Sequence, residues 1–391
     1  MYCRATWPTL RRWGISLPLY NFGLMVTALT LYLAVWFLIL SVSTLLFALR
    51  RSPAPEPLPN PLPRVSILIA ARNEEAAIGR CLHHIRQLHY PPELVEVLVG
   101  DDASSDRTRT LAERAMQDYA GTFRCVPITD TMGTALGKAN VLAHLARLAT
   151  TEYFFITDAD IAVPTSWLTG LLVHAQPRVG TVTGLTLVEG PRLFDQLQGL
   201  DWLLSLGLVQ VVSDLGRPVT AMGNNMLITR TAYEATGGYE RLPFSVTEDY
   251  ELFQAVLQQG FSFRNVFRPE VLAESLPMPS VSLLLHQRRR WLRGVEGLPW
   301  WLQAGLLVYA GFYPALLVLA LVVGPLAALV VLGAKMLLQG VLAALCFHRV
   351  GRRAPLRLLP LFEFYTLGLT VSLGLFRLLP IRFEWKGRQY K

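Results

Sequence analysis

The chain has 391 residues, of which 52% are hydrophobic and only 16% are charged. An ordinary soluble domain carries about 25% charged residues, so this composition argues against a purely soluble protein. The formal net charge is +8, but much of the basic excess lies beside apolar runs, where it suits anionic lipid headgroups better than nucleic acid. The four cysteines are scattered without a C-x-x-C pair, which excludes a disulfide framework and a structural zinc site.

Three apolar runs predict membrane segments. Residues 21–49 contain no charged residue, residues 301–347 contain only Lys335, and residues 358–380 contain only Glu363 and Arg377. A helix needs about 20 apolar residues to cross a bilayer, so the first run can supply one span and the second run two. The first run is far longer than the roughly 7–15 apolar residues of a signal peptide, so we expect an uncleaved anchor in an integral, multi-pass membrane protein.

The runs divide the chain into four expected parts. Residues 1–50 form an N-terminal segment with the anchor, and residues 51–63 form a proline-rich linker, because “RSPAPEPLPNPLPR” cannot be a regular helix or a central strand. Residues 64–296 form a soluble domain. Residues 297–391 form a C-terminal membrane region with two to three transmembrane segments and a basic tail.

The soluble part alternates between strand and helix patterns. “VSILIA”, “LVEVLVG” and “YFFIT” are short apolar runs typical of buried strands, and they alternate with helical stretches at about 74–89, 107–119 and 134–149. This alternation predicts an α/β fold with a parallel sheet and right-handed crossovers. Ligands of such sheets bind outside the C-terminal ends of the strands.

Acidic residues follow each predicted strand at that end. Asp101 and Asp102 follow the second strand, and Asp158 and Asp160 follow the third. On an extended chain, side chains at i and i+2 point to one side, so Asp158 and Asp160 could share Mg²⁺ or Mn²⁺ with a substrate diphosphate. Each acidic pair alone is weak evidence, because aspartate is common in turns.

Other polar residues also allow two interpretations. Lys138 in “GKAN” could be a solvated lysine or the partner of a diphosphate. In “TEDYELFQAVLQQG”, Thr247 is a good N-cap, and Glu248 and Asp249 suit the first turn of a helix, yet Asp249 would also be well placed as a general base. The “GNN” sequence that begins at Gly223 predicts a tight loop before a strand, of a kind that often contacts substrate.

A basic cluster, “LLHQRRRWLRG”, stands directly before the second apolar run. Its arginines could simply hold a loop on the cytoplasmic side of the membrane. Alternatively, Gln287, Arg290 and Trp291 form a Q-x-x-R-W motif that belongs to a site. We interpret the remaining arginines, Arg288, Arg289 and Arg293, as membrane-facing or topological.

The ordered set “SILIAARNEE”, “VGDDASSD”, “GKANVLAHL”, “DAD”, “TED” and “QRRRW” resembles the membrane-bound family 2 glycosyltransferases with a GT-A fold, over about residues 64–294. The resemblance implies a Rossmann-like, mixed but mainly parallel sheet domain inserted between transmembrane helices. It also implies that this domain lies on the cytoplasmic face of a bacterial inner membrane. The activity implied is an inverting, Mg²⁺- or Mn²⁺-dependent transfer of a hexose or N-acetylhexosamine from a UDP-sugar to a membrane lipid or a growing glycan.

The resemblance also implies roles for matched positions. Asp249 would be the catalytic base, with Glu248 beside it, and Asp158 and Asp160 would hold the metal. Residues expected to bind the nucleotide sugar are Ala70, Arg72, Glu75, Asp101, Asp102, Lys138 and Asp158. Residues expected to contact the diphosphate or the acceptor are Gln287, Arg290, Trp291, Gly223 and Asn224.

Several alternatives stay open. The chain could be a subunit of a processive polysaccharide synthase, although such enzymes tend to have more apolar runs, or a non-catalytic scaffold that retains nucleotide binding. A polyprenyl-phosphate sugar synthase shares the early motifs but would not be expected to carry Q-x-x-R-W. The “GNN” loop leaves the acceptor class open, and no protein partner is indicated. Four crossings would place both basic termini outside, against the positive-inside rule, so one apolar run could instead be re-entrant or interfacial.

Overall fold

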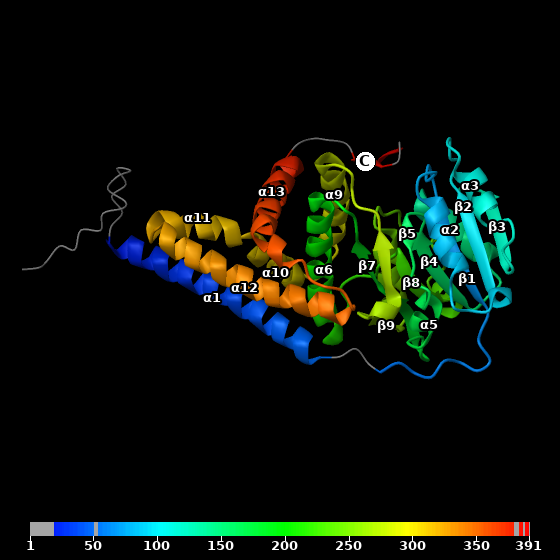
Figure 1. The fold of residues 1–391 in the computed structure, drawn as a ribbon, viewed down its shortest axis with the longest axis horizontal. Coiled ribbons are helices and arrows are strands. Elements are labelled where there is room, and N and C mark those ends of the chain that lie inside the picture. The colour runs from blue at the N-terminus through cyan, green and yellow to red at the C-terminus, as the bar shows by residue number, and fades with distance from the viewer. Residues whose placement is uncertain (1–18, 51–53, 379–382, 386–387, 391) are drawn as a thin grey trace, which may run out of the picture.

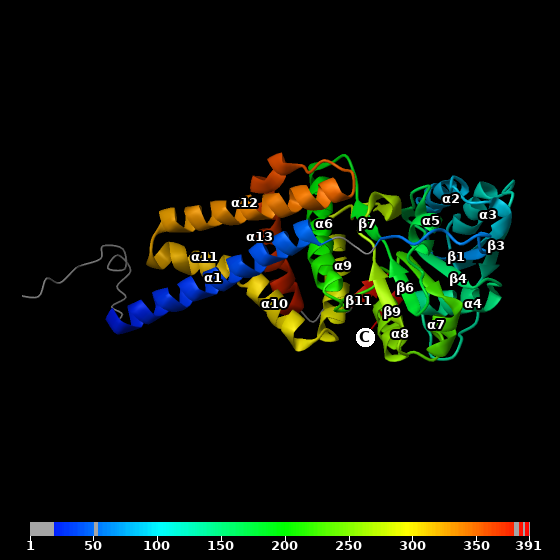
Figure 2. The same ribbon diagram turned by 90° about the horizontal axis from the view of Figure 1, so that it is seen from below.

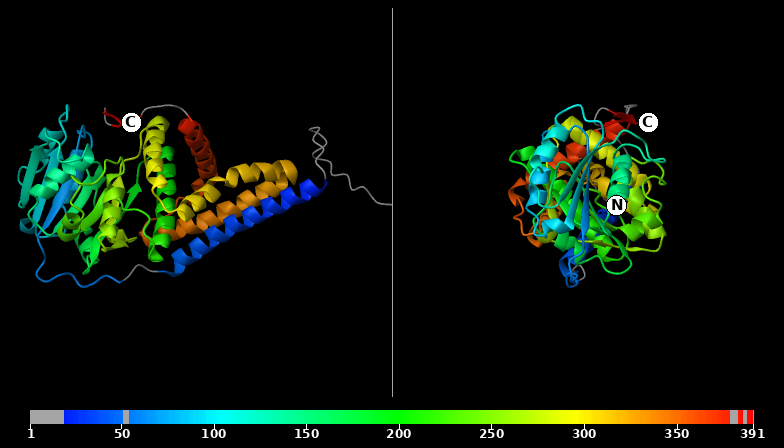
Figure 3. Two further views of the ribbon diagram at one scale, coloured as in Figure 1. Left: turned by 180° about the vertical axis from the view of Figure 1, so that it is seen from behind. Right: turned by 90° about the vertical axis from the view of Figure 1, so that its right-hand side faces the viewer.

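The computed structural model describes residues 19–50, 54–378, 383–385 and 388–390. The molecule is elongated, with an α/β body at one end and long helices at the other (Figure 1). The α/β body comprises strands β1–β10 with the helices α2–α5, α7 and α8. A layer of helices that run across the long axis separates the two ends, and Figure 3 shows the same order from behind.

The α/β body is built on a seven-stranded sheet in the order β3-β2-β1-β4-β8-β6-β9. Only β8 runs against its neighbours, so the sheet is mixed but mainly parallel, as predicted. The strands are β1 (Val65–Ala71), β2 (Val95–Asp101), β3 (Thr122–Pro127), β4 (Tyr153–Asp158), β6 (Val179–Thr183), β8 (Asn225–Thr229) and β9 (Ser262–Asn265). The edge strand β3 was not predicted, because its residues are only partly buried and show no apolar run. A smaller sheet joins β5 (Ile161–Ala162), β10 (Leu272–Ser275) and β7 (Leu185–Val188).

Helices cover both faces of the large sheet. They are α2 (Ile78–Arg86), α3 (Thr108–Ala115), α4 (Lys138–Leu148), α5 (Trp167–Leu172), α7 (Arg230–Ala235) and α8 (Glu248–Gln258), with short 3₁₀ turns η2 (Pro92–Leu94) and η3 (Pro269–Val271). Two of them start later than the sequence predicts. α2 begins at Ile78, after a turn in which the amides of Ala77 and Ile78 donate to the Glu74 carbonyl. α4 begins at Lys138, because Gly137 before it has a φ of 57°.

The middle layer contains α6 (Leu193–Asp214), α9 (Val281–Glu296) and α13 (Leu359–Leu378). In Figures 1 and 2 all three run across the long axis, between the α/β body and the long helices. α13 packs on both α9 and α6. The sequence analysis did not identify α6, although it is 22 residues long.

The far end consists of α1 (Leu19–Leu49), α10 (Trp300–Ala310), α11 (Phe312–Val322) and α12 (Pro325–Arg349). Three helices are long and apolar enough to cross a membrane, at Phe22–Leu49, Pro325–Arg349 and Leu356–Phe376, and the bent pair α10–α11 (40°) would make a fourth. The last of these stretches includes the turn η4 (Leu356–Leu358) and α13. A hairpin of β11 (Phe383–Trp385) and β12 (Arg388–Tyr390) follows, and β11 lies against α9.

Candidate active site

The predicted residues at the strand ends share one edge of the large sheet. Ala70 in β1 pairs with Asp158 in β4, and its neighbour Ala71 pairs with Asp101 in β2. β8 runs the other way, so its first residue, Asn225, pairs with Thr157 at the same edge. The sheet register therefore brings together residues that the sequence separates by more than 150 positions.

Lys138 connects two of the predicted groups. Its ammonium lies 2.6 Å from Asp158 Oδ1 and 3.2 Å from Glu248 Oε1, and only 15% of its side chain is exposed. Burial alone would lower the pKa of Lys138, but the negative charges of Asp158, Glu248 and Asp249 outweigh it and raise the pKa well above the usual value. Lys138 is therefore a permanent cation among three carboxylates.

Asp249 is held by backbone amides on both oxygens. Gly223 N–H donates to Oδ2 and Tyr250 N–H donates to Oδ1, each at 2.9 Å. The approach of Gly223 requires glycine, because a Cβ there would lie 2.5 Å from the Asp249 Cβ. Burial and the charge of Glu248 raise the pKa of Asp249 to about 6, while Lys138 and the two amides act in the opposite direction.

The start of α8, which carries Asp249, differs in one respect from the prediction that Thr247 caps the helix. Thr247 takes the N-cap position of α8, but its side chain makes no cap hydrogen bond. Its hydroxyl instead lies 3.0 Å from Ser245 Oγ. Asp249 thus depends on the Gly223 loop for its orientation, since the expected side-chain cap is absent.

Asp158 and Asp160 lie on either side of a turn between β4 and β5. Burial and the neighbouring charge of Asp158 raise the pKa of Asp160 to about 6, whereas Lys138 and Arg290 lower it. Among the described residues, no group of three or more His, Cys, Asp or Glu side chains could hold a metal ion. The two carboxylates nevertheless suit a hard cation that takes its remaining oxygen ligands from a diphosphate and water.

The arginine of Q-x-x-R-W lies close to this turn. The charge of Arg290 on α9 lowers the pKa of Asp160, so the two groups lie within electrostatic range of each other. Gln287 and Trp291 are half-buried on the same helix. The structure therefore brings the basic cluster to the edge that carries Asp158 and Asp160.

Arg288 corrects one sequence interpretation. It is not membrane-facing: 13% of its side chain is exposed, and it pairs with Asp201 of α6. Its guanidinium lies 4.6 Å from the ring centre of Trp291 and 5.4 Å from that of Trp202. The two indoles stack with centroids 4.5 Å apart. The Trp291 ring is thus fixed between α6 and its own helix.

The loops after β1 and β2 are fastened to each other. Arg72 donates to the carbonyl oxygen of Asp102, and Glu75 pairs with Arg107 at 3.0 Å. Asp101 accepts a hydrogen bond from the Ser104 amide at 3.2 Å. These contacts hold the two loops together at the C-terminal ends of β1 and β2. That the same residues contact a nucleotide remains a prediction.

The “GNN” loop at residues 223–225 is also anchored. Asn224 accepts a hydrogen bond from Thr186 on its side chain and another from Thr157 on its carbonyl, at 3.1 and 3.0 Å. Below it, the fully buried Asn225 donates to the carbonyls of Leu185 and Val271 at 2.8 and 2.9 Å. The loop that orients Asp249 is therefore rigidly attached to both sheets.

Sequence reasoning missed three residues near the site. Tyr239 is buried, and burial together with the charges of Glu248 and Asp249 raises its pKa. Asp201 and Trp202 belong to α6 and orient α9. None of the three lies in a recognisable motif; only the unidentified helix pattern around residue 201 could have drawn attention to them.

The comparison with known families decides the classification. The family model “Glycosyl transferase family 21” matches residues 26–391. The chain belongs to glycosyltransferase family 21. This membership confirms the predicted enzyme class and the resemblance to family 2-type glycosyltransferases.

Curated relatives match this family 21 chain over part of their length. A beta-monoglucosyldiacylglycerol synthase of Synechocystis is 27% identical over 237 residues, which are 60% of this chain and 48% of that protein. A 4,4'-diaponeurosporenoate glycosyltransferase of Staphylococcus aureus is 29% identical over 203 residues, 50% of this chain and 52% of that protein. The chain thus spans about half the length of the curated relatives it matches.

A solved structure shows the same fold. A mannosyltransferase from Pyrobaculum calidifontis, in complex with GDP-Man and Mn²⁺, has a TM-score of 0.58 and is 21% identical. The match covers 90% of this chain and 98% of that one. The likeness confirms the predicted GT-A-like fold across both the α/β body and the helices.

Proposed function

We propose that this family 21 chain transfers a hexose or N-acetylhexosamine from a UDP-sugar to a hydroxyl group of a membrane lipid, with inversion at the anomeric carbon. One observation carries the proposal. Asp249, oriented by the Gly223 amide, lies in the same charged cluster as Lys138 and Asp158, at the sheet edge where donors bind in folds of this type.

The lipid acceptor is supported by two kinds of evidence. The names of two relatives include a diacylglycerol product and the carotenoid acid diaponeurosporenoate. In this chain, α9 carries Arg290 towards the sheet edge and also packs on the apolar helix α13. An acceptor that leaves its tail among apolar helices could therefore present a hydroxyl to the site.

The proton transfer can be written from the geometry of Asp249. Its carboxylate takes the proton of the acceptor hydroxyl while the hydroxyl oxygen forms a bond to the anomeric carbon of the donor. The bond between that carbon and the phosphate oxygen breaks from the opposite side, and UDP leaves with the electron pair. Because the pKa of Asp249 is about 6, the carboxylate is ionised at neutral pH and remains a competent base.

The leaving diphosphate gathers negative charge, which cationic groups must stabilise. Lys138 is a fixed cation at this edge, and Arg290 lies near Asp160 on the other side. Asp158 and Asp160 would hold Mg²⁺ or Mn²⁺, which when bound would neutralise part of the diphosphate charge. The Lys138 ammonium lies 2.6 Å from Asp158 Oδ1, so the cation and this carboxylate share the same side of the proposed diphosphate site.

Release of nucleoside diphosphate by the detergent-purified full chain tests the proposal. UDP-glucose, UDP-galactose, UDP-N-acetylglucosamine and GDP-mannose are compared with Mg²⁺ or Mn²⁺, with and without diacylglycerol. We expect lipid-stimulated release from one UDP-sugar, and a loss of about 100- to 10,000-fold in Asp249→Asn. Asp118→Asn, at an exposed position outside the site, is the matched control and should retain full activity.

Three results would contradict the proposal. Release only from GDP-mannose would replace the donor, and activity of Asp249→Asn within tenfold of the wild type would remove the assigned base. Binding of UDP without turnover of any donor in the presence of lipid would favour a non-catalytic scaffold.

A further inference from the structure

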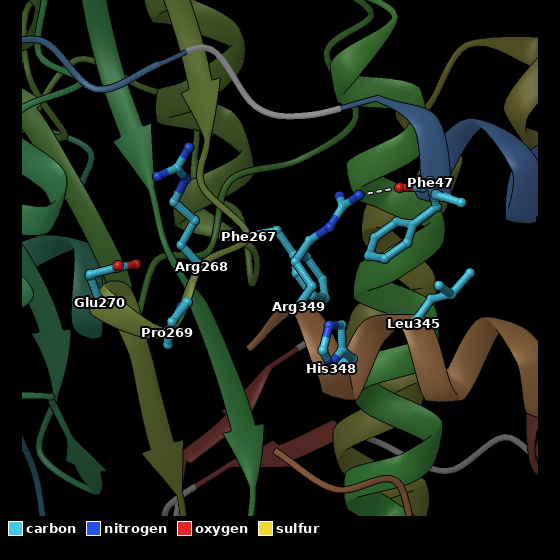
Figure 4. A pocket seen from close by; sticks show the side chains of 9 residues that line it. Phe47, Phe267, Arg268, Pro269, Glu270, Leu345, His348 and Arg349 are labelled. Carbon is cyan, nitrogen blue, oxygen red and sulfur yellow. Dashed lines mark hydrogen bonds between the residues drawn. The ribbon is translucent and has the colours of Figure 1, made fainter. Parts of the chain in front are cut away.

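A pocket lies where the ends of two long helices reach the α/β body (Figure 4). Its volume is about 370 Å³. The last turns of α1 and α12 form one wall, and the segment after β9 forms the other. None of the residues assigned above to the donor or to catalysis lines it, so it is separate from the candidate active site.

The pocket is bordered by basic side chains. Arg268 comes from the α/β body, and His348 and Arg349 come from the end of α12. In Figure 4, Arg268 and Arg349 extend in the same direction from opposite walls, with Phe267 between them. Glu270 is the acidic residue of the lining. The lining therefore favours an anion by charge.

These basic groups differ in the contacts that they make within the protein. Arg349 donates hydrogen bonds to the carbonyls of Phe47 and Arg50, and its guanidinium lies 3.8 Å from the Phe47 ring centre. These contacts fix its position. In the described part of the chain, no carboxylate lies within ion-pair distance of Arg268 or His348. Both retain donors for a ligand.

The remaining residues that line the pocket are mainly apolar. Phe47 and Phe267 are almost wholly buried and meet edge to face, with ring centres 5.2 Å apart. Leu345 completes this side. Both rings are almost wholly enclosed, so the apolar surface open to a ligand comes from Ala48 and Leu345, and the glycerol and first methylenes of a lipid would cover it.

The depth of the pocket also indicates a lipid. The candidate spans of α1 and α12 end at Leu49 and Arg349, so the lining residues of both helices belong to their final turn. At that level the hydrocarbon region gives way to headgroups. A phosphate attached to a bilayer lipid would thus lie at the height of the basic groups.

We propose that the pocket between Phe47, Phe267, Arg268 and Arg349 binds the phosphate of an anionic phospholipid, at a site distinct from the acceptor site. The guanidinium of Arg268 and the ring of His348 contact the phosphate, and Ala48 and Leu345 contact the glycerol. The bound lipid would join the ends of both spans to the α/β body. Binding of this lipid is measurable whether or not sugar transfer occurs.

Native mass spectrometry of the delipidated full chain tests the proposal. The probes are dilauroyl phosphatidylglycerol, dilauroyl phosphatidylcholine and glycerol 3-phosphate. The double variant Arg268→Gln/His348→Gln is compared with Arg353→Gln/Arg357→Gln, which removes two exposed basic side chains near the same helix ends but outside the pocket lining.

We expect the dissociation constant for phosphatidylglycerol to rise about ten- to hundredfold in the pocket variant, the range for losing hydrogen bonds to a charged group. The control variant should stay within about threefold of the wild type, because diffuse attraction is weak and screened. Glu270→Gln should tighten binding by removing the acidic lining charge, a gain that misfolding cannot produce.

Other outcomes would overturn the proposal. Equal weakening in both double variants would mean diffuse surface attraction, and equal affinity for phosphatidylcholine would mean that the net charge is not recognised. Displacement of the lipid by an equimolar amount of glycerol 3-phosphate would assign the site to a soluble phosphate. An unchanged or weaker affinity in Glu270→Gln would contradict the assumed position of the anion.

Discussion

At the scale of single residues, the charged cluster shifts the pKa of Asp249, the residue that we propose as the base. Burial and Glu248 raise its pKa to about 6, while Lys138 and the Gly223 amide limit the rise. A base works best when its pKa is near the working pH but still below it. The surroundings of Asp249 meet both conditions at neutral pH.

This balance predicts the pH dependence of the reaction. Asp249 acts as a base only when ionised, so kcat/KM should fall as the pH drops below about 6 and reach a plateau above it. Glu248→Gln removes a negative charge that raises the pKa of Asp249, so the acidic limb should move to lower pH. Initial rates between pH 4.5 and 8 check both statements.

Asp160 has a raised pKa in the same range, and its protonation would weaken metal binding. The profile is therefore measured at a metal concentration at which more metal has no further effect. An acidic limb that moves to higher pH in Glu248→Gln, or does not move, would contradict the assignment to Asp249.

At the scale of elements, α6 positions α9 through one ion pair and one aromatic stack. Burial raises the pKa of Asp201, and the charge of Arg288 acts against that rise. The same guanidinium lies over the ring of Trp291. A flat cation that stacks and pairs at once cannot be replaced by lysine without loss.

We therefore predict different consequences for two substitutions of Arg288. Arg288→Lys keeps a charge for Asp201 but loses the planar stacking, so the chain should fold while transfer to lipid falls about tenfold and UDP binding stays unchanged. Arg288→Gln should also lower the unfolding temperature, because it leaves Asp201 buried without its cation. Equal activity of Arg288→Lys and wild type would show that the stack has no role in transfer.

A second pair fixes α13 across α12. The ammonium of Lys335 lies 2.5 Å from Glu363, and the Tyr313 hydroxyl donates to the same carboxylate at 2.9 Å. Lys335 and Glu363 are only 2% and 6% exposed. Charged groups among apolar helices are costly unless paired, so this pair specifies how the two helices meet.

Single substitutions should destabilise the chain much more than the double substitution does. Lys335→Met or Glu363→Leu alone leaves one buried charge, which costs about 3–5 kcal/mol, whereas the double variant removes both charges and should recover most of the loss. Thermal unfolding of the purified variants, followed by size-exclusion chromatography, measures the effect. Additive losses in the double variant would show that the two residues do not act as a pair.

At the scale of the whole molecule, the direction of α13 bears on the membrane topology. α13 runs across α1 and α12 in Figures 1 and 2, beside α9, and the hairpin after it lies near the α/β body. With α13 in the membrane plane, α1, the bent pair α10–α11 and α12 give three crossings. The C-terminal end then lies on the side of the α/β body, where its basic residues are favoured.

This arrangement predicts which terminus a protease can reach. In inside-out vesicles, a cleavable tag at the C-terminus should be removed and a tag at the N-terminus should be protected. If α13 spans the bilayer instead, the C-terminal tag is protected in these vesicles and cleaved in spheroplasts. The N-terminal basic residues Arg4, Arg11 and Arg12 lie outside the described residues. The N-terminal tag therefore measures a position for which the structure makes no statement.

Much of the fold was predictable from local patterns. The strands at 65–71, 95–101 and 153–158 were predicted within a residue or two, because buried parallel strands are short, continuous apolar runs. The polar residues after these strands predicted the candidate site, because ligands of such sheets bind outside the C-terminal ends of the strands. β3 was missed because it is only partly buried and shows no apolar run. The helices α5, α6 and α7 and the short strands β5, β6, β7, β9 and β10 were not predicted either.

The sequence by itself determined the resemblance to family 2-type glycosyltransferases, the mainly parallel sheet, the apolar segments and most of the charged residues at the sheet edge. Only the tertiary structure decided that Lys138 joins Asp158 to Glu248, that Gly223 orients Asp249, and that Arg288 pairs with Asp201. The physical reason is that apolar periodicity is a local property of the chain. Ion pairs and close backbone approaches join residues far apart in sequence, and their partners are set by how the helices and sheets pack.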